Sequence, residues 1–415
     1  MGRRFAWTTL LLCWFLPGLF GQVVPDSSRA QTNPALLAFS RRSIFELSLQ
    51  ADTLAYTNAF PLGQVFQQTW TIDLDDVAGR LRRRDLRVGA AATAGSHLAL
   101  HFRRASAGVY AAARSTNELV IPYALIQLLA EGNVEDRSGS GKAVIRSGLE
   151  YGASVTADYG EWTFGMNLAQ YMPIMHSGDG GFSFDVVTTD AGFSADALVD
   201  VRVLSGIDLS LHGDGSGIDP APGFSNAALK ADVGVVRRDA FDRPIWGVSL
   251  TDLTVVRART PYEYRLTGSY GASVEHALQA LVDDADTDPL TLVAEEPELT
   301  FVGESDARVA LAPGVAGFYR FSVPYVDIIP HAHIVFDSLL GAFNPGLTVV
   351  GNRFPTNMVY VSYGRRRPVW RAVVGLRLPL RPIELSLELA GASPRLFGPF
   401  APDGLSAAVE ARLGL

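Results

Sequence analysis

Apolar residues alternate with polar or small residues along several stretches of the chain. In residues 44–51, Phe45, Leu47 and Leu49 fall on one face, and Glu46 and Ser48 on the other. The same two-residue period recurs in residues 97–103, 149–159, 162–169 and 405–413. This period predicts strands with one apolar face. For any single stretch, a soluble sandwich or barrel with its apolar face inward fits as well as a membrane barrel.

Three features together favour a membrane barrel. The expected strands are about 9–11 residues long, the length that crosses a bilayer when tilted. Aromatic residues stand near the strand ends, as in an interfacial girdle; they are Tyr151, Tyr159, Trp162, Tyr171, Trp246, Tyr262, Tyr363 and Trp370. The third feature is the first part of the chain, which carries a targeting signal.

Residues 1–22 read as a secretory signal peptide. Arg3 and Arg4 precede an apolar run over residues 6–20, interrupted by Pro17, and Gly21 is a plausible cleavage position. The run is too short for a membrane span and ends at Pro and Gly. Cys13 sits mid-run, so the lipoprotein alternative is disfavoured. Beyond residue 22, no apolar stretch approaches the ~18–20 residues of a helical span.

Gap lengths test the barrel independently, because such barrels have short periplasmic turns and longer outer loops. The expected gaps alternate as long (52–96), short (103–106), long (118–144), short (158–161), medium (172–181), short (191–194), long (205–226) and short (238–244). Between 253 and 312 the alternation fails, through one long outer loop or a missed strand. A helix is expected over 275–284, and strands resume at 313–323, 325–337, 356–364, 368–379, 382–392 and 404–414.

We therefore predict an all-β protein, a single transmembrane antiparallel β-barrel of about 14 strands (range about 12–16) with one or two short helices. Its expected parts are the signal peptide (1–22), an N-terminal lumenal segment (23–43) and the outer-membrane barrel (44–415). An apolar helix is expected over 122–130.

Charge and cysteine content exclude nucleic-acid binding by a basic face and two kinds of cysteine-dependent site. Without residues 1–22 the chain has 33 basic and 43 acidic residues, a formal charge of −10. That balance gives no polycationic face for nucleic acid. Cys13 is the single cysteine and lies within the signal peptide. A disulfide framework and a cysteine-ligated metal site are thereby excluded.

Three short motifs resemble the FadL-like (long-chain fatty-acid transporter) and PorV-like outer-membrane barrels. Residues 31–38 read QTNPALLA, with an Asn-Pro-Ala element before the first strand. Residues 120–123 (VIPY) are followed by the apolar helix, EGN at 131–133 and LEYG at 149–152. Residues 228–235 (ALKADVGV) lead to WGVSLTDL at 246–253. The resemblance implies an uncharacterised branch with a 14-stranded barrel and its N-terminal segment inside. It carries over no ligand pocket.

Asn33, Pro34 and Ala35 are the candidate lumenal plug. Pro34 fixes φ and biases Asn33 toward an extended or turn conformation. The Asn33 side chain can bond backbone groups that would otherwise be unpaired in the lumen. The alternative is that Asn33 caps a short helix over 35–39.

The sequence offers little catalytic or metal chemistry. No G-x-S-x-G, G-x-G-x-x-G, Walker or H-E-x-x-H motif occurs. His331 and His333 share a strand face, but two ligands without an acidic partner are a weak metal site. Asp284, Asp286, Asp288 and Glu295 have EF-hand spacing, but Pro289 stands where glycine is needed. A solvated acidic loop is expected there and at 213–222, with irregular Ca²⁺ binding as the alternative.

We expect no catalytic, cofactor or metal site and no enzyme activity. The expected contacts are outer-membrane lipid and a small hydrophobic ligand, with protein partners unknown. The first functional hypothesis is a passive channel for small hydrophobic molecules, gated by the N-terminal segment and the 122–130 helix. The alternative is a closed barrel that serves as a binding or scaffold component in secretion or surface assembly. A hydrolase with a triad assembled from different strands is the third.

Overall fold

The computed structural model describes residues 33–414, except 41–42, 60–73, 132–135, 190–191, 210–220, 276–289, 295–297, 337–341, 354–357, 367–368, 381 and 401. The signal peptide and the acidic residues Asp284, Asp286, Asp288 and Glu295 lie outside this part. So do residues 276–284 of the expected helix and most of the 213–222 loop.

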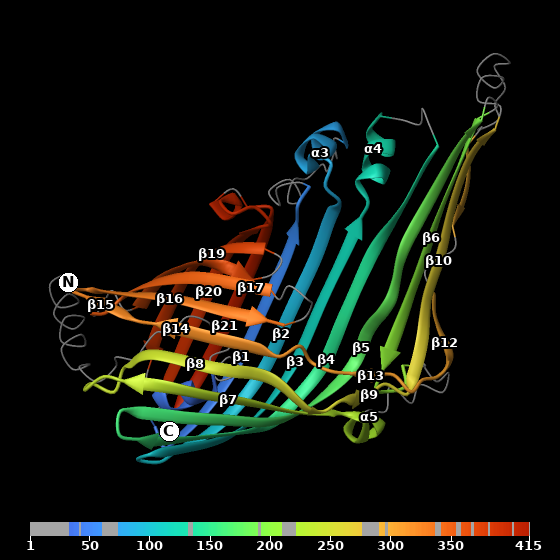
Figure 1. Ribbon diagram of the computed structural model, residues 1–415. Helices are drawn as coiled ribbons and strands as arrows, with labels where there is room; N and C mark the ends of the chain where they lie inside the picture. The colour runs from blue at the N-terminus through green and yellow to red at the C-terminus, as the bar shows by residue number, and fades with distance from the viewer. Residues whose placement is uncertain are drawn as a thin grey trace, which may run out of the picture.

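Antiparallel pairing closes the sheet into a barrel (Figure 1). The ring consists of β1 (Phe45–Thr57), β2 (Leu86–His101), β3 (Ala105–Ile121), β4 (Arg137–Tyr159), β5 (Trp162–Thr189), β7 (Ala228–Arg238), β8 (Pro244–Val256), β14 (Gly314–Tyr319), β16 (Val326–Val335), β17 (Ala342–Gly351), β18 (Val359–Arg366), β19 (Val369–Leu380), β20 (Ile383–Ser393) and β21 (Gly404–Gly414). Each strand pairs with the next, and β21 pairs back onto β1, from Glu46↔Gly414 to Tyr56↔Gly404. The closed ring leaves no sheet edge, as a sheet that crosses a bilayer requires.

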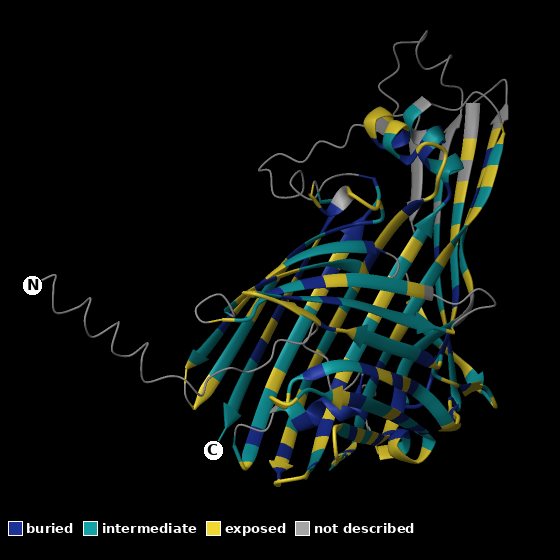
Figure 2. Cartoon of the chain, turned by 60° about the vertical axis from the view of Figure 1, so that its left-hand side comes forward, coloured by how far each residue is buried: buried dark blue, intermediate teal, exposed yellow. Residues whose placement is uncertain are grey.

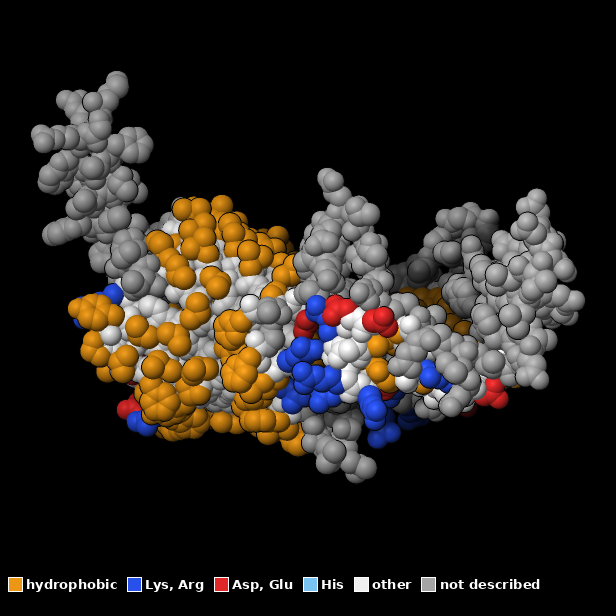
Figure 3. Space-filling view, turned by 90° about the horizontal axis from the view of Figure 1, so that it is seen from above, with side chains coloured by type: hydrophobic (Ala, Val, Ile, Leu, Met, Phe, Trp, Pro, Cys, Tyr) orange, Lys and Arg blue, Asp and Glu red, His pale blue; other side chains and the backbone are white. Residues whose placement is uncertain are grey.

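The faces of the strands are inverted relative to a soluble barrel. On β2, Leu98 and Leu100 are 37% and 45% exposed, while Ala99 and His101 between and beside them are buried. Figure 2 shows this alternation of exposed and buried residues along the strands, and Figure 3 shows hydrophobic side chains covering much of the wall. Polar side chains such as Glu150 and Lys230 are buried instead. An apolar exterior with a polar interior is the pattern of a transmembrane barrel.

One side of the barrel is much taller than the other. β5 has 28 residues and β19 has 12, about 90 Å and 40 Å at the rise of an extended strand. The lower half of β5 pairs with β7, and its upper half pairs with β6 (Gly192–Ser205). β10 (Tyr262–Glu275) pairs with β6 on one side and with β11 (Leu290–Ala294) and β12 (Glu298–Glu304) on the other. This extension therefore rises above the closed ring.

The extension and the additional strands bear on three predictions. Residues 172–181 are not a loop, because they lie inside β5. Of the two alternatives for the region 253–312, the missed strand is confirmed, because the region holds β10, β11, β12 and the short pair β9 (Ala258–Arg259) and β13 (Arg308–Val309). Within the described residues the sheet, extension included, has 19 strands, the short β15 (Phe321–Val323) among them, whereas the prediction was a barrel of about 14 strands (range about 12–16).

The sequence pattern missed the first half of one ring strand and the whole of another. The first half of β2 is rich in alanine and glycine and so lacks apolar alternation. β17 contains Asn344, Pro345 and Gly346, a combination typical of turns. Its pairing with β16 nevertheless continues through these three residues.

In the part of the chain that the structure describes, the helices are few and short. They are η1 (Pro34–Ser40), α3 (Leu74–Leu81), α4 (Tyr123–Glu131), α5 (Ala221–Asn226) and η4 (Gly398–Phe400). α4 confirms the helix expected over 122–130, whereas Glu275 of the helix expected over 275–284 ends β10. Among the described residues, no helix is long and apolar enough to cross a membrane.

The aromatic positions at the strand ends are partly confirmed. Trp162 and Trp246 pack edge to face, with ring centroids 5.3 Å apart, and Tyr159 is 80% exposed beside them. Tyr363 stacks on Trp370 with a centroid distance of 5.6 Å. Tyr171 is a correction, because it is buried with Ala228, Ala258 and Val309 rather than exposed at an interface.

Candidate functional site

Residues 33–40, the inner segment, lie inside the barrel. The segment contacts β3, β4, β5 and β7. Asn33 caps η1, because its Oδ1 accepts a hydrogen bond from Ala35 N at 3.0 Å. Its Nδ2 also donates to the Val248 carbonyl of β8 at 3.3 Å. The Asn33 side chain therefore fulfils both alternatives, since it caps the helix and also bonds a backbone group of the barrel wall.

Three wall glycines make room for the inner segment. A Cβ on Gly165 of β5 would lie 2.2 Å from Ala35 N, and one on Gly234 of β7 would lie 2.1 Å from Asn33 Oδ1. A Cβ on Gly247 of β8 would lie 3.1 Å from Asn33 Nδ2. Gly165 and Gly234 are register partners. These glycines form a cradle in which the backbone of the inner segment lies directly on the wall.

Apolar packing completes this docking. Ala35 and Leu36 are buried with Val236 of β7, and Phe39 and Phe318 pack against them. Phe318 belongs to β14, which pairs with β8 next along the wall. The inner segment is thereby held by hydrogen bonds, by close backbone contact and by buried apolar surface.

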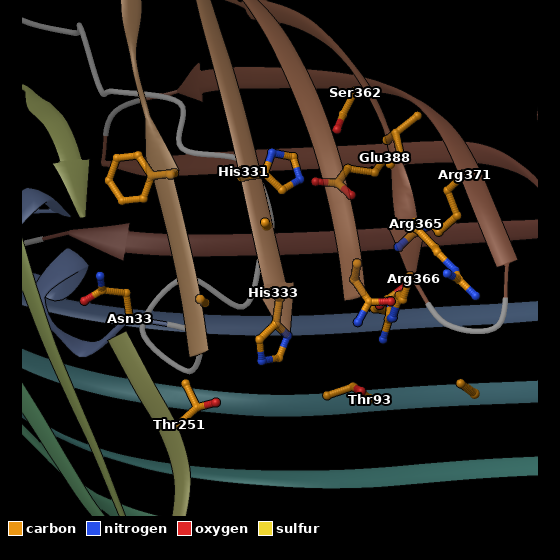
Figure 4. A pocket seen from close by; sticks show the side chains of 18 of the residues that line it. Asn33, Thr93, Thr251, His331, His333, Ser362, Arg365, Arg366, Arg371 and Glu388 are labelled. Atoms are coloured by element: carbon orange, nitrogen blue, oxygen red, sulfur yellow. The ribbon is translucent and has the colours of Figure 1, made fainter. Parts of the chain in front are cut away.

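A cavity of about 420 Å³ lies beside the inner segment. Asn33 and Leu36 of the segment line it, together with side chains from both walls of the barrel. In Figure 4, Asn33 and Thr251 lie on one side, and Arg365, Arg366, Arg371 and Glu388 on the other. His331 and His333 project between these two groups. The inner segment thus leaves room for several water molecules in part of the lumen.

One wall of the cavity carries a buried charge network. Lys230 Nζ lies 2.9 Å from Glu150 Oε1, 2.6 Å from Asp252 Oδ1 and 3.7 Å from Asp232 Oδ2. Arg114 Nη2 lies 2.9 Å from Glu150 Oε2. Asp252 has a φ of 55°, and its N–H donates to Asp232 Oδ1 at 2.7 Å. The network ties β3, β4, β7 and β8 together above the glycine cradle.

The opposite wall carries arginines with partners on neighbouring strands. Arg366 of β18 forms an ion pair with Asp52 of β1. Arg371 Nη2 of β19 donates to Ser406 Oγ of β21 at 2.7 Å. The cavity therefore lies between two charged walls, as the constriction of a selective pore does.

Apolar clusters occupy the taller side of the barrel. Leu128 of α4 is buried with Phe184 and Val186 of β5. Nearer the closed ring, at the base of the extension, Val201 and Val203 are buried with Tyr264. α3 and α4 also pack on each other, through Ala78, Leu81 and Ile126. Apolar surface thus gathers beyond the polar cavity.

The two histidines of the weak metal candidate lie in the cavity wall. His331 and His333 are on β16, and each pairs in register with β14, opposite Phe318 and Ala316. Across the part of the chain that the structure describes, no group of three or more His, Cys, Asp or Glu side chains is placed to hold a metal ion.

Sequence reasoning singled out Asn33, Pro34 and Ala35 but missed most of their surroundings. The cradle glycines, the charge network and the paired arginines were not predicted as a site. A signal for them existed. Lys230 and Asp232 occupy the polar positions of one motif, and Gly247 and Asp252 lie in the next. An inward-facing charged residue on a barrel strand indicates a lumenal contact.

The comparisons with known proteins give no family. No protein-family model matches the chain, and no curated protein matches it. It is similar in structure to the Pseudomonas putida toluene transporter TodX, with 8% identity, 94% of this chain and 95% of that chain covered and a TM-score of 0.40. It is also similar to the Ralstonia pickettii toluene transporter TbuX, with 9% identity, 94% of this chain and 94% of that chain covered and a TM-score of 0.31. The translocator domain of the Neisseria meningitidis autotransporter NalP has 7% identity to this chain and a TM-score of 0.29, with 93% of this chain and 100% of that chain covered.

The architecture follows from the chain's own strand pairing and burial. It is a closed antiparallel β-barrel with an apolar exterior, a charged lumen and an inner segment docked on a glycine cradle.

Proposed function

We propose that the protein is a passive outer-membrane channel in which the inner segment acts as a lumenal plug. Asn33, Pro34 and Ala35 are the residues that hold the plug in place. The observation that carries this proposal is the docking of the segment on Gly165 and Gly234 beside a cavity of about 420 Å³. The glycine cradle fits the inner segment closely, which supports closure of the lumen by this segment. The cavity beside the segment supports a route past it.

The apolar exterior and the lengths of the turns support an outer-membrane location and an orientation for the barrel. Apolar side chains cover the exterior, and β-barrels of this kind occur in outer membranes. The turns at residues 102–104 and 160–161 are short, whereas the connections that contain α3 and α4 are long. Short turns face the periplasm in such barrels. The end with α3 and α4 is therefore the outer end in this proposal.

Small hydrophobic molecules are the solutes that the proposal favours. Around the buried Leu128 and Val201, partly exposed apolar side chains such as Leu125 and Leu266 lie on the taller, outer side, where a solute would first contact the protein. α4 is itself apolar and carries no acidic residue in its first turn. No coupling ion or nucleotide is needed, because the solute gradient supplies the driving force.

Uptake by whole cells tests the proposal with two probes. Cells with the protein in their outer membrane are compared with cells that lack it. Uptake of the apolar dye N-phenylnaphthylamine should rise. Periplasmic hydrolysis of a polar β-lactam should rise less, because a polar solute gains nothing from the apolar clusters. Equal dye uptake in both strains would contradict the hydrophobic solute class.

A plugged lumen also suits the alternative function, a scaffold barrel without transport. Uptake by the wild type and uptake by a variant that lacks residues 23–40 together separate the two functions. In a channel the deletion raises the uptake of both probes, whereas in a scaffold the wild-type protein gives no uptake and copurifies with a partner.

A further inference from the structure

Three short turns meet at the end of the barrel opposite α3 and α4. They join β2 to β3, β4 to β5, and β7 to β8. The Asp158 N–H donates to the Arg104 carbonyl at 2.8 Å, and the Arg238 N–H donates to the Glu161 carbonyl at 2.7 Å. Backbone hydrogen bonds therefore fix the three turns to one another, so that side chains from all three share one place.

These turns enclose a cavity of about 380 Å³. It is lined by Arg103, Arg104, Asp158, Tyr159, Gly160 and Arg238. The lining thus holds three arginines and one carboxylate. Asp242 adds a second carboxylate at the edge, because its Oδ1 lies 3.1 Å from Arg238 Nη1. The remaining net positive charge favours an anion over a cation or a neutral group.

The arginines divide into one that is fixed and two that are available. Arg238 Nη1 lies 3.3 Å from Asp158 Oδ2, and its Nη2 donates to the Gly160 carbonyl at 2.8 Å. Arg103 and Arg104 are exposed. Within the described part of the chain, neither guanidinium has a side-chain partner. Two guanidinium groups beside a cavity match the geometry of a phosphate, which accepts hydrogen bonds from arginine at several oxygens.

An apolar wall begins directly beside this cavity. Phe102 is 58% exposed next to Arg103, and Phe164 is 50% exposed above the β4–β5 turn. Tyr159 and the Trp162–Trp246 pair lie at the boundary. Aromatic side chains at this level mark the interface between lipid headgroups and acyl chains. A ligand that fills the cavity with an anionic group can therefore lay an apolar tail along Phe102 and Phe164.

We propose that this rim cavity binds the phosphate headgroup of an anionic phospholipid. Arg103 and Arg104 contact the phosphate, Arg238 closes the cavity behind it, and the acyl chains lie on the exterior wall. The assignment of the ligand to the periplasmic leaflet rests on the proposed function, because that function orients the short turns. The cavity is separate from the inner segment and takes no part in solute passage.

Binding of short-chain phosphatidylglycerol to the full-length protein in detergent tests the proposal. The wild type should bind it, and the double variant R103A/R104A should bind about thirtyfold more weakly, since each arginine near an anionic headgroup contributes about a fivefold factor. The matched control is R83A/R84A, which removes the same charge at the outer end and should bind as the wild type does. Both variants should keep heat-modifiable gel mobility, because all four side chains are exposed.

Inorganic phosphate and short-chain phosphatidylcholine distinguish the possible ligands. Both should bind at least tenfold more weakly than phosphatidylglycerol, because one lacks the tail and the other lacks the net negative charge. Phosphate binding as tight as lipid binding would overturn the lipid assignment. An equal loss in R103A/R104A and R83A/R84A would overturn the site, since only net charge would matter. Neither result depends on conductance, so failure here is distinguishable from failure of the proposed function.

Discussion

Substitution of Gly165 by alanine should open the channel without unfolding the barrel. The added Cβ would lie 2.2 Å from Ala35 N and 2.4 Å from the Pro34 carbonyl carbon, and both are backbone atoms. Ordinary van der Waals contact between such atoms begins near 3.5 Å, so the two backbones must separate by about 1 Å. The wall is paired on both sides of Gly165, with Thr156 and Gly234. The inner segment is therefore the part that moves.

The expected magnitude follows from the cost of overpacking. Inserting a methyl group into a close contact costs about 1–3 kcal/mol. If that cost weakens docking of the inner segment alone, the ratio of open to closed barrels rises about 5- to 150-fold. The closed state stays the more populated one only if the free energy of docking of the inner segment exceeds this cost.

Single-channel recording in planar bilayers measures this ratio as open probability. Gly317→Ala is the matched control, because Gly317 also lines the cavity, but its Cβ would approach nothing closer than the Gly247 carbonyl at 3.4 Å. That variant should conduct as the wild type does. If Gly165→Ala is folded and its open probability equals that of Gly317→Ala, the docking of the inner segment does not control conduction.

Three further substitutions test the network, the exterior and the cavity. Lys230→Met should destabilise the barrel by about 3–5 kcal/mol, because Glu150 and Asp252 lose a buried counter-charge; urea unfolding in lipid should show this, with the exposed Lys142→Met unchanged. Val109→Arg, at a site that is 56% exposed on the outer face, should cost about 2–4 kcal/mol in the same assay, against about 0–1 kcal/mol for Tyr159→Arg at the rim; equal costs would place the bilayer elsewhere. Arg366→Ala combined with Gly165→Ala should shift the reversal potential in a salt gradient toward cation selectivity, because one lumenal cation is lost; an unchanged potential would show that ions do not pass the paired arginines.

The sequence pattern was sufficient for the exterior of the barrel. Leu98, Leu100, Phe164 and Met166 were expected on one face and are exposed there. This worked because the alternation depends only on nearest neighbours along a strand. The same local pattern cannot show which strands become neighbours, and so it could not reveal that β5 changes partner from β7 to β6 along its length.

The site was predicted only where its signal was local. Pro34 and Asn33 restrict the backbone of their own segment, and the sequence shows this directly. The contact of Ala35 with Gly165 joins residues far apart in the chain. A glycine inside a strand can equally mark a bulge or a bend, so Gly165 alone does not predict that contact. The contact between Lys230 and Asp252 likewise depends on a β-bulge that shifts the register between β7 and β8, and the sequence does not show this bulge.

The most direct test of the central claim is the conductance of a barrel that lacks the inner segment. Residues 33–40 are deleted from the full chain, and ion current through single barrels in a planar bilayer is compared with that of the wild type. We predict a wild type that is mostly closed and a deletion variant that is stably open, with both showing heat-modifiable mobility. A folded deletion variant that remains closed would contradict the claim that the inner segment closes the lumen.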